Sequence, residues 1–327
     1  MKTRNLGATG EKVSALGLGC MGMTGRYGPA DTQENLAVLH KALDIGINFL
    51  DTADMYGSGE NEKLLSEILA TRRDEVFLAT KFGFRPDASG KMGVDVTPEY
   101  ARQAIDASLR RLKTDHVDLY YAHRVDPKVP VEETVGALGE LVKAGKVRYI
   151  GICEASEASV RRAHKEYPLA AVQSEYSLLT REPEEAIIPA CAELGISFVP
   201  YSPLSRGLVT AVMPEPDTMV SDDFRRSLPR FTGENLRANK ELAREFASLA
   251  QSLGCSAAQL ALAWILHKGD TIIPIPGTKR LKYLEENAGA TEINLDKKDM
   301  ERIEALLEAH PAAGQRYDAG NMGLVDR

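Results

Sequence analysis

The chain has 327 residues, and a hydrophobic fraction of 43% is enough to fill a sizeable core. Its 40 basic and 47 acidic residues give a formal net charge of -7 and form no block of like charge, which disfavours nucleic-acid and membrane partners. Four cysteines without a Cys-x-x-Cys pair favour reduced thiols in a cytoplasmic protein. The sequence shows no signal peptide, no long apolar span and no metal-ligand spacing.

Strand and helix patterns alternate along the whole chain. A hairpin with turn residues Gly7–Gly10 is expected first, within residues 1–14. The predicted strands are Ala15–Gly19, Ile47–Leu50, Val76–Thr80, Val117–Ala122, Val147–Ile152, Ala170–Gln173, Ser197–Tyr201 and Thr271–Ile275. The predicted helices include Thr32–Leu43, Glu62–Ala70, Pro98–Leu112, Val131–Ala144, Ser156–Glu166 and Pro183–Leu194. Eight strands that alternate with helices predict an α/β fold, a single (β/α)8 TIM barrel over residues 1–327, rather than two domains.

Two segments depart from this even alternation. Residues 204–237 form a connection rich in Pro, Asp and Arg, which is too long for a plain linker and is interpreted as a lid over cofactor or substrate. Residues 309–327 form a C-terminal tail that contains glycine. We expect this tail to reach the rim of the barrel.

The string Gly17-Leu18-Gly19-Cys20-Met21-Gly22 follows the first strand and matches the G-x-G-x-x-G pattern of dinucleotide-binding loops. Such a loop must open a helix, so that backbone amides meet the pyrophosphate. The residues that follow, from Met23 to Pro29, break helices instead. We therefore interpret the string as a glycine-rich loop at the barrel rim.

Four residues with the side chains needed to reduce a carbonyl group stand just past the ends of three consecutive strands. They are Asp51 and Tyr56 after the second strand, Lys81 after the third and His123 after the fourth. In a closed barrel these strand ends share one rim, where chemistry takes place. A phenol is a poor proton donor at pH 7, and the ammonium group of Lys81, held by Asp51, is expected to lower its pKa. His123 could donate a hydrogen bond to a carbonyl oxygen.

These residues and their surroundings resemble the aldo-keto reductase superfamily over essentially the whole chain. The matching segments are Leu16–Met23, Asn48–Gly57, Ala79–Lys81, Asp118–Arg124 and Ile275–Arg280, and the string Asp222–Arg226 resembles a perakine reductase-like subgroup from bacteria and plants. The resemblance implies a barrel that binds NADPH and reduces small-molecule aldehydes or ketones to alcohols. It implies Tyr56 as general acid, tuned by Lys81 and Asp51, and His123 as the residue that orients the carbonyl.

The resemblance also implies residues that hold NADPH/NADP+. Gln173 matches a contact to the nicotinamide carboxamide, Tyr201 matches the aromatic residue that stacks on the ring, and Cys153-Glu154 stands where most of the family has Ser-Asn. Matches to the contacts with the phosphates and adenosine are Ser202, Leu204, Gly207, Gly277, Thr278, Lys279, Arg280, Glu286 and Asn287. Lys279 and Arg280 favour NADPH over NADH, because the additional phosphate binds charged donors.

Three alternatives remain beside this interpretation. Glu154 and Glu175 follow neighbouring strands and could be the paired carboxylates of a glycosidase. Lys81 could form a Schiff base, although a lysine nucleophile would not have a carboxylate beside it. The third is an NADPH-binding redox-sensing or accessory protein with low turnover, like the channel β-subunits of the superfamily. The sequence names neither the physiological substrate nor the oligomeric state.

Overall fold

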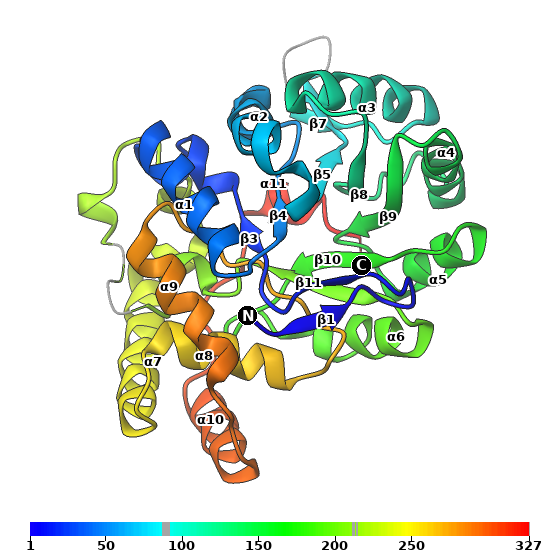
Figure 1. Ribbon diagram of the computed structural model, residues 1–327. Coiled ribbons are helices and arrows are strands. Elements are labelled where there is room, and N and C mark those ends of the chain that lie inside the picture. Colours follow the sequence, from blue (N-terminus) through cyan, green and yellow to red (C-terminus); the bar gives the residue numbers. More distant parts are fainter. Residues whose placement is uncertain (87–91, 211–212, 214, 327) are drawn as a thin grey trace.

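The computed structural model describes residues 1–86, 92–210, 213 and 215–326. Within them, seven parallel strands form one sheet in the order β11-β10-β9-β8-β5-β4-β3, and helices surround the strands (Figure 1). The strands of this sheet are β3 (Leu18–Gly19), β4 (Phe49–Asp51), β5 (Phe77–Phe82), β8 (Val117–Ala122), β9 (Val147–Cys153), β10 (Ala171–Glu175) and β11 (Ser197–Tyr201). The predicted (β/α)8 barrel is confirmed, except that the eighth predicted strand does not form a regular strand.

The altered strand is the eighth, expected at Thr271–Ile275, which joins β11 to β3 through isolated bridges instead of a continuous ladder. The amides of Ile273 and Ile275 donate to β11, and the carbonyls of Pro274 and Pro276 accept from Gly17 and Gly19. Both prolines lack an N–H, so this segment returns no hydrogen bond from those positions to β3. Between the closing segment and β3, the hydrogen bonds are therefore donated from the β3 side and accepted by the closing segment.

Glycines on the β3 side let this closing segment approach. A Cβ atom on Gly19 would lie 2.8 Å from the carbonyl oxygen of Ile275, and one on Gly17 would lie 2.8 Å from the Ile275 side chain. Both approaches are closer than real Cβ contacts allow. The G-x-G string therefore serves barrel closure at this point, which agrees with its interpretation as part of the rim.

The predicted N-terminal hairpin is present as β1 (Thr3–Asn5) paired antiparallel with β2 (Lys12–Ser14). Leu6 and Val13 pack with Phe49, Phe77 and Leu119 in the core inside the barrel. The hairpin, dark blue in Figure 1, therefore closes the end of the barrel at which the strands begin. A second hairpin, β6 (Phe84–Pro86) with β7 (Met92–Val94), follows β5.

The helices pack outside the strands on a second, larger core. Asp31, Thr97 and Ser156 cap their helices, since each side chain accepts a backbone N–H of the first turn. The helices are α1 (Thr32–Asp44), α2 (Glu60–Arg72), α3 (Pro98–Leu112), α4 (Val131–Lys143), α5 (Glu157–Glu166), α6 (Ile187–Leu194), α7 (Gly233–Ser252), α8 (Ala257–His267), α9 (Leu281–Gly289), α10 (Lys297–Ala309) and α11 (Ala319–Met322).

Several predicted boundaries shift by one to three residues, and two are wrong by more than that. The helix expected from Pro183 begins at Ile187, because a 3-10 turn at Glu182–Glu184 is followed by Ala186 with a non-helical backbone. The connection predicted to reach residue 237 ends earlier, because α7 begins at Gly233. Residues 211, 212 and 214 of that connection, and residue 327 of the tail, lie outside the described residues.

Among the described helices, none is by itself long and apolar enough to cross a membrane. Helices α7 and α8 reach that length and composition only as a pair, which bends by 84°.

Candidate active site

The predicted site residues lie together at one end of the barrel, here called the mouth. Side chains along a strand alternate between two faces, so the inward positions of β5 are Phe77, Ala79 and Lys81. The register Phe49↔Phe77 and Asp51↔Ala79 makes Phe49 and Asp51 the inward positions of β4. The same alternation makes His123, Cys153, Gln173 and Tyr201 inward positions in the C-terminal halves of their strands or directly after them. The chemistry-bearing residues therefore gather at the end opposite the hairpin.

Lys81 lies at the centre of this mouth and is fully buried. Its Nζ atom donates to Oδ1 of Asp51 at 2.5 Å, to the Thr52 carbonyl at 2.8 Å and to the Tyr56 hydroxyl at 3.3 Å. The loop that carries Tyr56 turns sharply, with left-handed backbone at Gly57 and Ser58. Asp51, Lys81 and Tyr56 thus form a chain of contacts that ends in a phenol.

The expected lowering of the Tyr56 pKa is offset by burial. Burial raises the pKa of Tyr56 to about 12, while the positive charge of Lys81 acts in the opposite direction. Burial would lower the pKa of Lys81, but Asp51 and Tyr56 hold it above its ordinary value, so the amine stays charged. The phenol is therefore a weaker acid than a free tyrosine in this structure, and Lys81 limits the effect of burial.

His123 lies beside Tyr56, with ring centroids 5.9 Å apart and an edge-to-face arrangement. Burial, together with the charges of Lys81 and Arg124, keeps the pKa of His123 well below its ordinary value. The imidazole is therefore neutral at pH 7. Its Nδ1 atom is buried without a hydrogen-bond partner in the described part of the chain.

Gln173 and Cys153 line the same mouth from β10 and β9. The Gln173 amide donates to Oδ2 of Asp51 at 2.9 Å, while Lys81 donates to the other oxygen, Oδ1. Cys153 is buried, and burial raises the pKa of its thiol far above the usual range. The thiol is therefore protonated, and can serve only as a weak hydrogen-bond partner.

Glu154 and Glu175 are engaged by arginines. Arg316 donates to both oxygens of Glu154, at 2.8 and 2.5 Å, and Arg206 donates to both oxygens of Glu175, at 3.3 and 2.5 Å. Arg230 lies 3.6 Å from Glu175. Burial would raise the pKa of Glu154, but Arg316 holds it below the usual range. A glycosidase needs one carboxyl group with a raised pKa, so this pairing disfavours that alternative.

The C-terminal tail reaches the rim, as expected from the sequence. The Tyr317 hydroxyl lies 2.9 Å from the Tyr201 hydroxyl, and Oδ2 of Asp326 accepts the amide and hydroxyl of Ser156. The Asp326 amide donates to the Glu154 carbonyl at 3.1 Å. The tail is thus attached to the loops that follow β9 and β11.

The loop after β11 has unusual backbone geometry. Ser202, Ser205, Arg206 and Gly207 all have positive φ angles, between 50° and 96°. Such conformations are strained for residues other than glycine, and successive turns of this kind form concavities that bind anions. Ser202, Leu204 and Gly207, predicted from the sequence to contact the cofactor phosphates, belong to this loop, in which the amides of Ser205 and Gly207 donate to the carbonyls of Ser202 and Leu204.

The predicted cations after the closing segment contact the loop before α1. Lys279 Nζ donates to the carbonyls of Tyr27, Gly28 and Pro29, at 3.1, 3.0 and 2.5 Å, and Arg280 pairs with Glu34. Gly277 and Thr278 precede them, while Glu286 and the buried Asn287 lie on α9. The structure therefore brings these residues to one side of the rim, with both cations bound to other parts of the chain.

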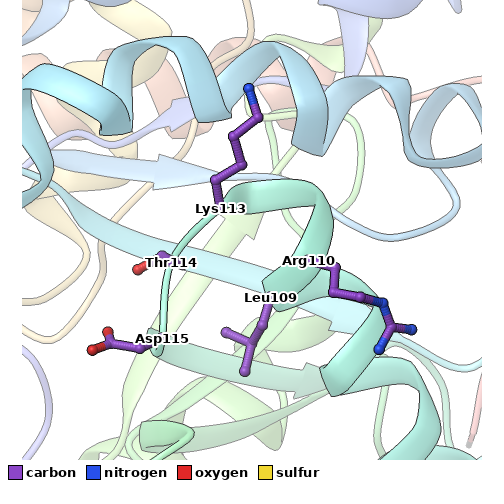
Figure 2. A pocket seen from close by; sticks show the side chains of 5 residues that line it. All are labelled: Leu109, Arg110, Lys113, Thr114 and Asp115. Carbon is purple, nitrogen blue, oxygen red and sulfur yellow. The ribbon is translucent and has the colours of Figure 1, made fainter.

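A separate surface depression lies far from these residues. It is lined by Leu109, Arg110, Lys113, Thr114 and Asp115, where α3 turns into β8 (Figure 2). This turn leads into the first residue of β8, at the hairpin end of the barrel. None of the predicted site residues lines it.

The model of the aldo/keto reductase family matches residues 15–308. The chain is 44% identical to a probable aldo-keto reductase of Glycine max, covering 96% of this chain and 91% of that protein. It is 43% identical to the aldo-keto reductase yakc [NADP(+)] of Schizosaccharomyces pombe, covering 97% and 95%.

A solved glycerol dehydrogenase of Gluconobacter oxydans is similar in structure, with a TM-score of 0.85 at 28% identity, over 94% of this chain and 95% of that one. Most of the chain thus matches one family in both sequence and structure. The chain belongs to the aldo/keto reductase family, and its class is oxidoreductase.

The pairing of arginines with rim carboxylates was not predicted from the sequence. Arg206 and Arg316 are two of 40 basic residues, and no spacing relates them to Glu175 and Glu154. One signal was available, because a carboxylate at a barrel strand end is buried and a buried carboxylate needs a cation.

Proposed function

We propose that this protein reduces aldehydes or ketones to alcohols with NADPH, and that Tyr56 gives the proton to the carbonyl oxygen. The observation that carries the proposal is the buried chain Asp51–Lys81–Tyr56, with neutral His123 beside the phenol. Acid catalysis of this kind needs a proton donor held at one place, together with a second donor for the oxygen.

Each residue has a defined part in this proposal. Tyr56 donates its hydroxyl proton, and the Lys81 ammonium stabilises the phenolate that remains. Asp51 keeps Lys81 charged and fixed, with its second oxygen held by Gln173. The neutral imidazole of His123 donates a hydrogen bond to the carbonyl oxygen.

The residues proposed for NADPH follow the barrel rim. Tyr201 would lie against the nicotinamide ring, Gln173 and Cys153 by the carboxamide, and the strained loop of Ser202, Leu204 and Gly207 by the diphosphate. Gly277, Thr278, Lys279, Arg280, Glu286 and Asn287 would hold the adenosine phosphate and adenine. When bound, this cofactor supplies the hydride. We leave Glu154 out of the proposed cofactor contacts, since both its carboxylate oxygens accept hydrogen bonds from Arg316 of the C-terminal tail.

The direct test is a fluorescence titration with NADPH, followed by its oxidation in the presence of a panel of aldehydes and ketones. Binding with turnover supports a reductase. Binding without turnover on any member of the panel would favour the accessory-protein alternative, and absence of binding would contradict both.

The preference for NADPH over NADH is expected to be at least about tenfold in affinity, or roughly 1.4 kcal/mol. The physical reason is that Lys279 and Arg280 can exchange their present partners for a phosphate dianion. Replacing both by alanine should make the two affinities equal, as measured by fluorescence titration. Lys282→Ala removes an exposed cation from α9 and is the matched control, which should keep the preference. Equal affinities in the unaltered protein would contradict this assignment.

A further inference from the structure

Arg124 directly follows His123 at the mouth and is held beside it. Its Nη1 atom donates to the His123 carbonyl at 2.7 Å. The guanidinium lies 5.1 Å from the centroid of the Phe84 ring, which itself meets the His123 ring edge-on at 4.9 Å. The positive charge therefore stands next to the residue proposed to orient the carbonyl.

The guanidinium of Arg124 has more donors than partners. It carries five N–H groups, and the hydrogen bonds found in the described part of the chain use one of them. The Nε atom is buried and has no acceptor there. Burying an unpaired donor is unfavourable, so this position can accept a hydrogen-bond acceptor from a bound molecule.

The two rim glutamates do not supply that acceptor. Glu154 acts electrostatically on Arg124, but its oxygens are bound by Arg316. Glu175 is bound in the same way by Arg206.

With Arg230, four arginines share this part of the rim with two glutamates. Cations therefore outnumber carboxylates among these groups. Arg124 is also within electrostatic range of Cys153, Tyr201 and Tyr317, which surround the proposed nicotinamide site.

We propose that Arg124 binds a carboxylate group of the substrate, so that the preferred substrates are aldehydes or ketones that carry a carboxylate. This inference rests on the proposed reductase function. A planar guanidinium pairs with a carboxylate through parallel, charge-assisted hydrogen bonds. Because the Phe84 ring contacts both the His123 ring and the Arg124 guanidinium, one small molecule can present its carbonyl to His123 and its carboxylate to Arg124.

The test compares two substrates that differ in charge and little else, succinic semialdehyde and its methyl ester. The unaltered protein should show a kcat/KM at least about tenfold higher for the acid, because only the acid can form charge-assisted hydrogen bonds with the guanidinium. In Arg124→Met the ratio of acid to ester should fall to about one, through a loss on the acid that appears mainly in KM. Arg124→Lys, which keeps the charge but not the planar fork, should retain part of the preference.

Arg85→Met is the matched control. It removes a charge from an arginine on the neighbouring hairpin, which is 47% exposed and paired with Asp95. The acid-to-ester ratio should stay unchanged in this variant. Equal rates for acid and ester in the unaltered protein, or an equal loss on both in Arg124→Met, would overturn the inference while leaving the reductase proposal intact.

A binding measurement tests the inference without turnover. Saturation-transfer NMR in the presence of NADP+ should show butyrate bound to the unaltered protein and butyramide not bound. Arg124→Met should lose the butyrate signal but keep its cooperative thermal transition, which shows that it folds. Binding of butyrate by Arg124→Met as strong as in the unaltered protein would contradict the inference even if no carbonyl compound is reduced.

Discussion

Tyr56→Phe is expected to lower the turnover number for aldehyde reduction by about 10² to 10⁴-fold, the usual contribution of a positioned acid. The substitution removes the hydroxyl that lies 3.3 Å from Lys81 and leaves the ring that packs against His123. The affinity for NADPH should therefore hardly change. Steady-state kinetics and a fluorescence titration on the same preparation measure both quantities.

Tyr120→Phe is the control for this variant. The Tyr120 hydroxyl is also buried, has no partner among the described residues and belongs to the outer core of β8. Its removal should leave turnover unchanged. If Tyr56→Phe reduced aldehydes at the unaltered rate, the proposed chemistry would be wrong, whatever the family.

Lys81→Met should cause a loss of turnover of similar size, about 10² to 10⁴-fold. Without the ammonium, nothing offsets the burial that raises the pKa of Tyr56 to about 12, so the phenol becomes a still weaker acid. The substitution also leaves Asp51 as an unpaired buried carboxylate, which costs roughly 3 to 5 kcal/mol of stability.

The double variant Asp51→Asn with Lys81→Met separates the two effects. It should recover much of the lost stability, measured by chemical denaturation, without recovering turnover. Recovery of both would mean that Lys81 has only a structural part.

The sign of the pH dependence follows from the same pKa values. A phenol whose pKa is raised to about 12 keeps its proton at neutral pH, and His123, whose pKa is lowered, stays neutral there. The kcat/KM of the unaltered enzyme should therefore be level from about pH 7 to about pH 9 and fall only toward the phenol pKa. A steep fall through neutral pH would indicate a different acid.

Much of this fold can be predicted from the sequence because apolar residues recur at different spacings in strands and in helices. Helix α3 occupies its predicted span, Pro98–Leu112, since a threonine cap and a proline mark its start. The eighth strand shows the limit of this reasoning. An apolar run indicates a strand, but only the partners show that Pro274 leaves a hydrogen bond of the ladder unmade.

The candidate site likewise has one part that the sequence predicts and another that it does not. Asp51, Lys81 and His123 could be placed together because the ends of parallel strands share a rim, whatever the details of packing. The ion pair of Arg316 with Glu154 joins positions 162 residues apart. Nothing local determines it, because it depends on how the tail crosses the rim. The net shift of the Tyr56 pKa was not predicted for a related reason: Lys81 acts to lower it as expected, but burial, which depends on the whole mouth, outweighs that effect.

The prolines at the closing segment have a consequence for aggregation. If the barrel opens there, during folding or under stress, one of the two new edges carries proline: Pro274 and Pro276 when the segment separates from β3, and Pro200 when it separates from β11. An exposed edge is dangerous because its free donors and acceptors can pair with a strand of another molecule. Proline has no donor to offer, so these edges are poor templates for such pairing. The closing segment, which pairs with its neighbours only through isolated bridges, is thus also protected against intermolecular β-sheet growth.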